Sequence, residues 1–208
     1  INQNLVIKEG SELLTMSSMK NIVAKATVEE NFPKEIAIYD LNEFLASLSI
    51  FKSPVLEFEE QYLTIKEEDQ PHKKLTYFYS DPSVVQSPTK TITMPSEEVK
   101  FHLDMNKLLE MKRAAGVIGS PDMVLQKSSG NSSLLVKDKK NDTANNYSSD
   151  IKTDGDGEYK FFFKVENLKL FDGDYDVKIS SKNISHFKND KSNIEYWIAL
   201  EPESTYSV

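Results

Sequence analysis

Hydrophobic and polar positions along this chain follow a strand period over most of its length and a helical period in two stretches. Short apolar or alternating runs end at turn residues across Val55–Phe58, Tyr62–Lys66 and Leu75–Phe78. Such runs are typical of half-buried antiparallel strands. The pattern therefore predicts a protein that is mostly β-sheet with few helices.

Two amphipathic helices are predicted. The first begins after Asp40, which forms a capping pair with Glu43. The second covers Asp104–Gly116, with Lys107 and Arg113 on its polar side. The buried stripes consist of Leu41, Phe44, Leu45 and Leu48 in the first helix, and of Met105, Leu108, Leu109, Met111 and Ala115 in the second. Lys112 falls inside the second stripe, so its amino group has to reach outward past the apolar arc.

The order of predicted elements occurs twice, which indicates an internal duplication. A strand followed by a helix at 35–45 has its counterpart at 159–170, and a hairpin at 55–66 has its counterpart at 176–187. An aromatic strand that ends in an acid-proline pair covers 75–83 and again 195–203, and the opening hairpin covers 5–17 and again 123–137. We therefore expect two similar α+β domains.

The domain limits follow from this duplication. The first domain covers 1–80, a connector with three prolines covers 81–95, and the second domain covers 96–208. A helix precedes the opening hairpin of the second copy and has no counterpart ahead of Ile1, so we expect that the first domain lacks its N-terminal helix here. The polar stretch Ser128–Glu158 is expected to form long solvated loops around one short strand at 134–136.

Composition argues against several functional classes. The absence of cysteine excludes disulfides, zinc ribbons and thiol catalysis, and no apolar run is long enough to span a membrane. With seven glycines and no phosphate-binding or dinucleotide motif, the sequence predicts no enzyme, no cofactor and no metal. Asp154–Glu158 lacks the later ligands of a calcium loop, and His72, His102 and His186 are interpreted as incidental polar residues. An intracellular protein fits best.

The charge distribution matters more than the net charge. A formal net charge of -8 argues against a nucleic-acid partner, because phosphates are contacted by lysine and arginine. Yet Lys100–Arg113 carries four basic against two acidic residues, and Arg113 is the single arginine of the chain. On the residues alone, a solvated helix face paired with Asp104 and Glu110 is the plainer explanation.

Four strings together resemble a known family. They are Ile36–Leu45, Leu108–Arg113, Leu168–Tyr175 and Tyr196–Thr205, and they resemble the sliding clamp of T-even-type bacteriophages. The similarity runs in order along nearly the whole chain and is weakest at 128–158. It implies an α+β fold of two DNA-clamp domains, with antiparallel sheets outside and helices lining the inside of a homotrimeric ring.

The resemblance also implies a function. Such a clamp encircles duplex DNA without reading its sequence and tethers the replicative DNA polymerase, which confers processivity without catalysis. Its implied partners are an ATP-driven clamp loader, the C-terminal peptide of the polymerase and late-transcription factors, in the cytoplasm of an infected bacterial host. The alternative is a phage structural ring protein of the tail or capsid, which can also be acidic, duplicated and β-rich.

The resemblance assigns two sets of site residues. The DNA-facing set consists of Lys107, Lys112 and Arg113, with Lys169 from the shorter helix of the second copy and Lys52 after the first helix. The partner-peptide set consists of Val84, Val85, Trp197, Ala199, Leu200 and Pro202. Alternatively, Trp197 and Leu200 simply fill the second core, as alternating strand residues usually do.

Overall fold

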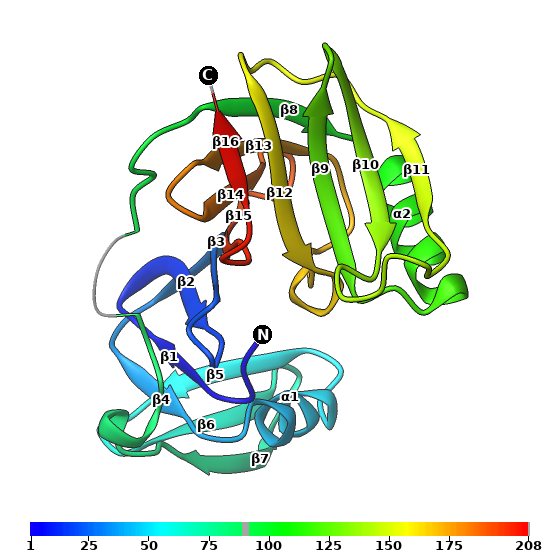
Figure 1. Cartoon of the computed structure of the whole chain (residues 1–208). Coiled ribbons are helices and arrows are strands. Elements are labelled where there is room, and N and C mark those ends of the chain that lie inside the picture. The colour runs from blue at the N-terminus through cyan, green and yellow to red at the C-terminus, as the bar shows by residue number, and fades with distance from the viewer. Residues whose placement is uncertain (89–91, 208) are drawn as a thin grey trace. The chain divides into compact units, whose positions relative to one another are not determined.

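The chain forms two compact units, Ile1–Lys90 (unit 1) and Thr91–Val208 (unit 2). The computed structural model describes residues 1–88 and 92–207. In these ranges each unit combines antiparallel strands with one α-helix (Figure 1).

Unit 1 contains two sets of antiparallel strands. The first set, in the order β4-β1-β2-β3, consists of β1 (Leu5–Ile7), β2 (Gly10–Met16), β3 (Ile22–Phe32) and β4 (Ile36–Ile38). The second set, in the order β5-β6-β7, consists of β5 (Pro54–Phe58), β6 (Tyr62–Glu67) and β7 (Gln70–Phe78). Helix α1 (Leu41–Ser49) joins the two sets, and the 3-10 turn η1 (Pro82–Val84) follows the last strand.

Unit 2 repeats this plan with additions. Its first set, in the order β11-β10-β9-β12-β16, consists of β9 (Asp122–Ser128), β10 (Asn131–Lys137), β11 (Tyr147–Asp150), β12 (Glu158–Lys164) and β16 (Thr205–Ser207). Its second set, in the order β8-β13-β14-β15, consists of β8 (Val99–Leu103), β13 (Tyr175–Ser180), β14 (Ile184–Asn189) and β15 (Ile194–Ala199). Helix α2 (Met105–Ile118) lies against β9, β10 and β11, and η2 (Val165–Asn167) is a single 3-10 turn.

The predicted duplication is confirmed by the strand order. The order β4-β1-β2-β3 of unit 1 corresponds to β12-β9-β10-β11 of unit 2, and β5-β6-β7 corresponds to β13-β14-β15. Unit 2 adds β8 and α2 ahead of its opening hairpin, at the place where unit 1 begins with β1. The α+β class with two similar domains is therefore correct.

The core of unit 1 lies between its two sets of strands. Seven buried residues form it: Ile7, Ile36, Ile38, Phe44, Phe51, Leu63 and Ile65. Phe44 is the contribution of α1, and its ring meets that of Tyr77 on β7 at 5.1 Å between centroids. Burial of each such side chain contributes about 1.5–3 kcal/mol. The helix is thus held to both sets of strands.

Aromatic side chains connect the layers of unit 2. Phe163 on β12 packs edge-on against Phe187 on β14 at 6.0 Å, and Tyr175 on β13 contacts Phe187 at 6.2 Å and Tyr196 on β15 at 6.1 Å. Edge-to-face pairs of this kind add about 0.5–1.5 kcal/mol beyond the area that they bury. This chain of rings fixes the sheet that carries Trp197.

The predicted helix starts are confirmed at both helices. The Asp40 carboxylate accepts the backbone N–H of Glu43 at 3.0 Å, and the Asp104 carboxylate accepts that of Lys107 at 2.8 Å. Helix α2 is capped after Ile118 by Gly119, whose φ of 66° is the left-handed conformation that glycine adopts at low cost. Both ends of α2 are therefore set by local chemistry.

The predicted buried stripes are too wide. Leu45 on α1 is 52% exposed and Leu109 on α2 is 45% exposed, although both fit the helical period. The residues buried on α2 are Leu108, Met111 and Ala115. Only this narrower arc contacts the core. A side chain one position beyond a buried residue is rotated about 100° around the helix and points past the edge of the core. Each helix thus presents an exposed leucine.

The predicted helix at 159–170 is wrong in its second half. After β12 the chain makes only the 3-10 turn η2, and Lys169 follows that turn instead of lying in a helix. Leu168 and Leu170 are both buried while Lys169 is exposed, which is the alternation of an extended segment. Gly173 then adopts a φ of 146°, which other residues rarely adopt.

Two segments predicted as irregular contain regular structure. Strand β11 pairs with β10 through Leu134↔Ser149 and Val136↔Tyr147, so 128–158 is not only solvated loop. Its polar residues do not predict a strand, but backbone hydrogen bonds to the apolar strand β10 stabilise one there.

The connector also contains regular structure. The Asp81 carboxylate accepts the Ser83 N–H and begins η1 with Pro82. Residues 89–91 lie outside the described residues.

The predicted match of the last strands is shifted by one residue. The match of 75–83 with 195–203 aligns Tyr77 with Trp197, but Tyr77 faces the core beside Phe44 whereas Trp197 does not. The Tyr79 N–H donates to Gln61 as the Leu200 N–H donates to Asn183, so Tyr77 corresponds to the buried Ile198. Since strand side chains alternate between faces, the shift of one residue moves the pairing to the opposite face of the sheet. Trp197 therefore corresponds to Thr76.

Candidate functional site

The outer face of α2 is the first candidate. With 3.6 residues per turn, Arg113 lies opposite the buried residues Leu108, Met111 and Ala115. Its guanidinium is therefore at the centre of the exposed face. In the described part of the chain, no carboxylate forms a salt bridge with Arg113. A guanidinium without a salt-bridge partner on a helix face can donate two hydrogen bonds to one phosphate in a bidentate arrangement.

Lys107 has a different environment from Arg113. Its amino group forms a salt bridge with Glu110 at 3.1 Å and donates a hydrogen bond to Ser149 on β11. The Tyr147 hydroxyl donates to the same Glu110 carboxylate at 2.6 Å. The Tyr147 hydrogen bond, followed by Lys107, lowers the pKa of Glu110. Lys107 is thus held toward β11 by internal partners, as the solvated-face alternative expects.

Lys112 lies on the opposite flank of α2. It is half-buried, and burial lowers its pKa while the carboxylate of Asp172 opposes that change. The start of α2 is fixed to the same segment, because the Asp174 carboxylate accepts the Met105 N–H at 2.9 Å. Lys112 therefore faces the segment after η2, with its charge partly balanced by Asp172.

Lys169 and Lys52 are exposed lysines that follow short elements in the two units. Lys169 lies on the segment after η2 between two buried leucines, so its side chain points away from the core. Lys52 follows α1, where its backbone N–H donates to the Glu67 carboxylate at 3.0 Å. The structure brings Arg113, Lys112 and Lys169 onto two adjacent elements of unit 2 and places Lys52 in unit 1.

The partner-peptide residues fall into exposed and buried groups. In unit 1, Val84 is 57% exposed, whereas Val85 is buried with Val6 and Ala37. In unit 2, Leu200 is buried and Pro202 is exposed. Leu200 therefore fills the core, as the alternative expected, and Val85 belongs to a small internal cluster. The remaining accessible candidates are Val84, Trp197, Ala199 and Pro202.

Trp197 lies on the outer face of its sheet rather than in the core. Strand β15 buries Tyr196 and Ile198 and turns Trp197 to the other side. The indole stacks on the imidazole of His186 at 4.8 Å, and His186 Nε2 is 2.8 Å from a Glu195 carboxylate oxygen. His186 is therefore not incidental, and the cross-strand position opposite Trp197 is the signal that would have identified it.

The His186 pair gives a pH-dependent stability. Burial lowers the pKa of His186 below its usual 6.5, against the opposing effect of Glu195; Lys178 and Glu97 contribute smaller effects. Below about pH 6.5 the unfolded chain binds this proton more readily than the folded chain. The free energy of unfolding should therefore fall as the pH decreases from that value toward the lower folded-state pKa.

Urea unfolding followed by the single tryptophan measures this effect. The substitution His186→Gln should flatten the fall in unfolding free energy, and the control His72→Gln, at an exposed position, should retain it. An equal pH slope in the wild-type chain and in His186→Gln would contradict the assignment.

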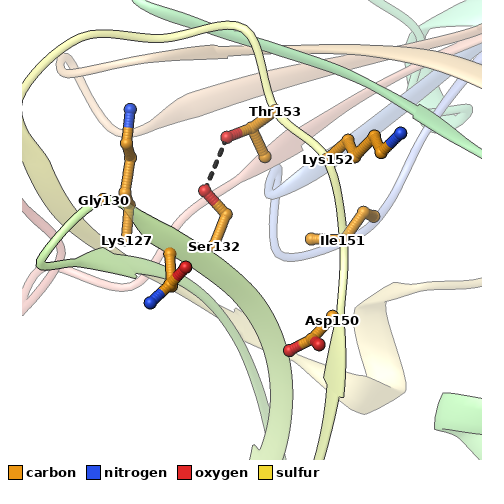
Figure 2. Close-up of a pocket in the computed structure, with 8 residues that line it drawn as sticks. Lys127, Gly130, Ser132, Asp150, Ile151, Lys152 and Thr153 are labelled. Atoms are coloured by element: carbon orange, nitrogen blue, oxygen red, sulfur yellow. Dashed lines mark hydrogen bonds between the residues drawn. The ribbon is translucent and has the colours of Figure 1, made fainter.

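A polar hollow of about 860 Å³ lies beside the turn between β9 and β10. The Ser132 and Thr153 hydroxyls hydrogen bond at 2.8 Å, as Figure 2 shows, and Thr153 contacts the Tyr159 hydroxyl at 2.6 Å. The amino groups of Lys127 and Lys152 point away from each other, and Asp150 lines the same hollow. The charges do not converge, so this hollow is not an anion site.

The described residues, 1–88 and 92–207, contain no group of three or more histidine, aspartate or glutamate side chains placed to hold a metal ion. Neither of their helices is long and apolar enough to cross a membrane.

Comparison with known proteins decides the family. Residues 100–202 match a family model described as the C-terminal part of the gp45 sliding clamp. The sliding clamp of Vibrio phage KVP40 is 30% identical over 207 residues, which cover 97% of this chain and 92% of that protein. The chain belongs to the phage sliding-clamp family. The resemblance based on the four sequence strings is confirmed.

More distant relatives of this sliding-clamp chain extend the comparison. The sliding clamp of Enterobacteria phage T4 is 25% identical, over 99% of this chain and 92% of that protein. The A. fulgidus PCNA, in a structure with the C-terminal region of FEN-1, superposes with a TM-score of 0.69 at 16% identity, over 99% of this chain and 92% of that one. The PCNA2-PCNA3 complex of Sulfolobus tokodaii gives a TM-score of 0.64 at 12% identity, over 96% and 90% of the chains. The DNA-clamp fold class is therefore correct.

Proposed function

We propose that this sliding-clamp chain assembles head to tail into a closed ring of three copies around duplex DNA and tethers the replicative DNA polymerase. Family membership and the duplicated strand order carry this proposal. Three copies of a two-unit chain supply six similar units, and a head-to-tail contact closes when its rotation divides the circle. The domain limits 1–80, 81–95 and 96–208 belong to the same proposal.

One edge strand of each unit is suited to ring closure. In unit 2, β11 pairs only with β10 among the described strands, and in unit 1, β7 pairs only with β6. An edge strand presents unpaired N–H and C=O groups that another strand can satisfy. We infer that β11 of one copy adds to β7 of the next, which makes a continuous sheet across the contact.

Apolar side chains lie beside both edges. A groove of about 510 Å³ between α2 and the start of β11 is lined by Leu109, Val117 and Tyr147, together with the charged pair Glu110 and Arg113. Beside β7, Tyr39 is 64% exposed. Apolar groups that meet at the centre of a contact favour association of the two copies.

Retention on DNA then depends on topology. A closed ring leaves DNA only when a protein contact opens or when it slides off an end, so few phosphate contacts suffice. Arg113, Lys112 and Lys169 contact the backbone without reading bases, which keeps neighbouring registers similar in energy. A net charge of -8 repels DNA from the remaining surface.

The partners belong to the same proposal. An ATP-driven clamp loader opens the ring, and the C-terminal peptide of the polymerase docks on the accessible residues of unit 2, Trp197, Ala199 and Pro202. Late-transcription factors use the clamp in the same way. The chain acts by tethering and catalyses no reaction. The alternative of a structural ring in a tail or capsid has no relative among the proteins matched above to support it.

Release from linearised DNA tests encirclement. Clamp loaded on a nicked circular plasmid should stay bound through gel filtration at moderate salt and should leave when a single restriction cut opens the circle. Binding that is unaffected by the cut means ordinary surface attachment. A plasmid with both ends blocked by bound proteins is the control, and it should retain the clamp after the same cut.

A further inference from the structure

The outer face of the β6–β7 hairpin in unit 1 is an unusual surface. Three consecutive cross-strand pairs cover it: Tyr62↔Phe78, Thr64↔Thr76 and Lys66↔Lys74. The alternate residues of the same strands, among them Leu63 and Ile65, are fully buried in the core. The pairs of aromatic, hydroxyl and ammonium side chains therefore share one solvent-facing strip, which we call the hairpin face.

The aromatic end of the hairpin face is open to solvent. Phe78 is 68% exposed, and its ring contacts that of Tyr62 at 5.5 Å between centroids. Unit 2 also has a cross-strand ring pair on its β14–β15 hairpin, Trp197 with His186, where His186 is buried and bonded to Glu195. The ring pair of unit 1, in contrast, is left uncovered. Exposed aromatic side chains of this kind are frequent anchors of protein contacts.

The lysine end has an excess of positive charge. Like charges directly opposite each other on neighbouring strands destabilise a sheet, and Lys66 and Lys74 occupy such positions. Lys66 is paired with Glu57 on β5, whereas no carboxylate of the described residues forms a salt bridge with Lys74. In unit 2 the cross-strand pair next to Trp197 is Lys188↔Glu195, which combines opposite charges. An external carboxylate would relieve the repulsion in unit 1.

These two ends fit one kind of occupant. We propose that the hairpin face binds an extended acidic segment of a partner protein, with an apolar anchor on Phe78 and Tyr62 and carboxylates on Lys66 and Lys74. Four residues of strand separate the two ends, about 13 Å, so the anchor and the acidic residues lie about four positions apart in the segment. The inference rests on the proposed function, in which the clamp recruits partner proteins.

A synthetic probe tests the face directly. The probe is a fluorescent peptide with two aspartates at one end and two phenylalanines about four residues away, and its anisotropy is measured against the full chain without DNA. Phe78→Ala and Lys74→Glu should each weaken binding about tenfold, which is the effect of losing one anchor. Phe171→Ala, at a residue that is 62% exposed in unit 2, and Lys182→Glu are the matched controls and should bind normally.

Each other outcome overturns the proposal. Equal binding of a probe with lysines in place of aspartates means that charge plays no part. Normal probe binding by Phe78→Ala and Lys74→Glu places the site elsewhere on the chain. A change in sedimentation caused by Phe78→Ala assigns the face to contacts between copies. Because no DNA is present, failure here leaves the linearisation result unaffected, and failure of encirclement leaves the peptide result interpretable.

Discussion

Replacing Leu109 and Val117 with aspartate should split the ring into single copies. Val117 is 78% exposed and Leu109 is 45% exposed in the isolated chain, so neither substitution removes a core contact. In the ring, each would bury a carboxylate in an apolar contact, which costs several kcal/mol without a partner. We expect assembly to weaken by at least about a hundredfold, which corresponds to about 2.8 kcal/mol per contact.

Sedimentation velocity over a range of concentrations measures this change. The control Met19→Asp places the same charge on a residue that is 81% exposed on the turn between β2 and β3, and should leave the trimer intact. Circular dichroism should show unchanged folding in both variants. If the Leu109 and Val117 variant remains a trimer at the concentrations at which the unsubstituted chain is one, α2 is not part of the contact between copies.

Charge reversal at Arg113 and Lys169 should abolish retention on DNA while the ring stays closed. Each substitution to glutamate changes the charge by two, so the net charge of a ring of three copies falls by twelve along its inner face. For every lost phosphate contact, about one counterion fewer is released from the DNA when the clamp binds. We expect processive synthesis with loader and polymerase to fall by at least about tenfold, and the salt dependence of DNA binding to become shallower.

The design separates DNA contact from assembly. Lys20→Glu with Lys182→Glu changes the net charge by the same amount at exposed lysines elsewhere and should retain processivity. Lys107 is excluded from the reversal, because it is paired with Glu110 and its replacement would disturb α2 and β11. If the Arg113 and Lys169 variant sediments as single copies, then Arg113 belongs to the rim of the ring contact and not to the DNA surface.

Much of the fold could be predicted because the relevant signals are local. Asp40 and Asp104 cap the helices through backbone N–H groups only three residues away. The hairpin at Val55–Phe58 and Tyr62–Lys66 follows from apolar runs around a short turn, and the duplication follows from comparing the chain with itself. These features require no knowledge of what packs against them.

Other features depended on partners distant in sequence. Strand β11 consists of polar residues and forms because β10 offers a ladder. Leu45 and Leu109 fit the helical stripe and are nonetheless exposed, since the width of the contact is set by the sheet and not by the helix. The shift of one residue between Tyr77 and Trp197 is not visible in the sequence, because both strands have aromatic residues at adjacent positions.

The candidate site shows the same division. The sequence identified Arg113 as the single arginine, on the polar side of a helix, and that placement is correct. It could not distinguish Arg113 from Lys107, because the carboxylate that pairs with Lys107 is held in place by Tyr147, a residue 37 positions from Glu110. It also missed His186, whose importance lies in the ring stacked on it from the next strand.

By itself, the amino-acid sequence determined the α+β class, the repeated order of elements, the helix starts and the family, because periodicity, capping and similarity are properties of neighbouring residues. Only the tertiary structure decided which leucines are buried, which lysines are already paired, which aromatic residues face solvent and where polar residues form a strand. Burial and pairing depend on which segments meet in space, and the same side chain is core, contact or solvated surface according to what lies opposite it.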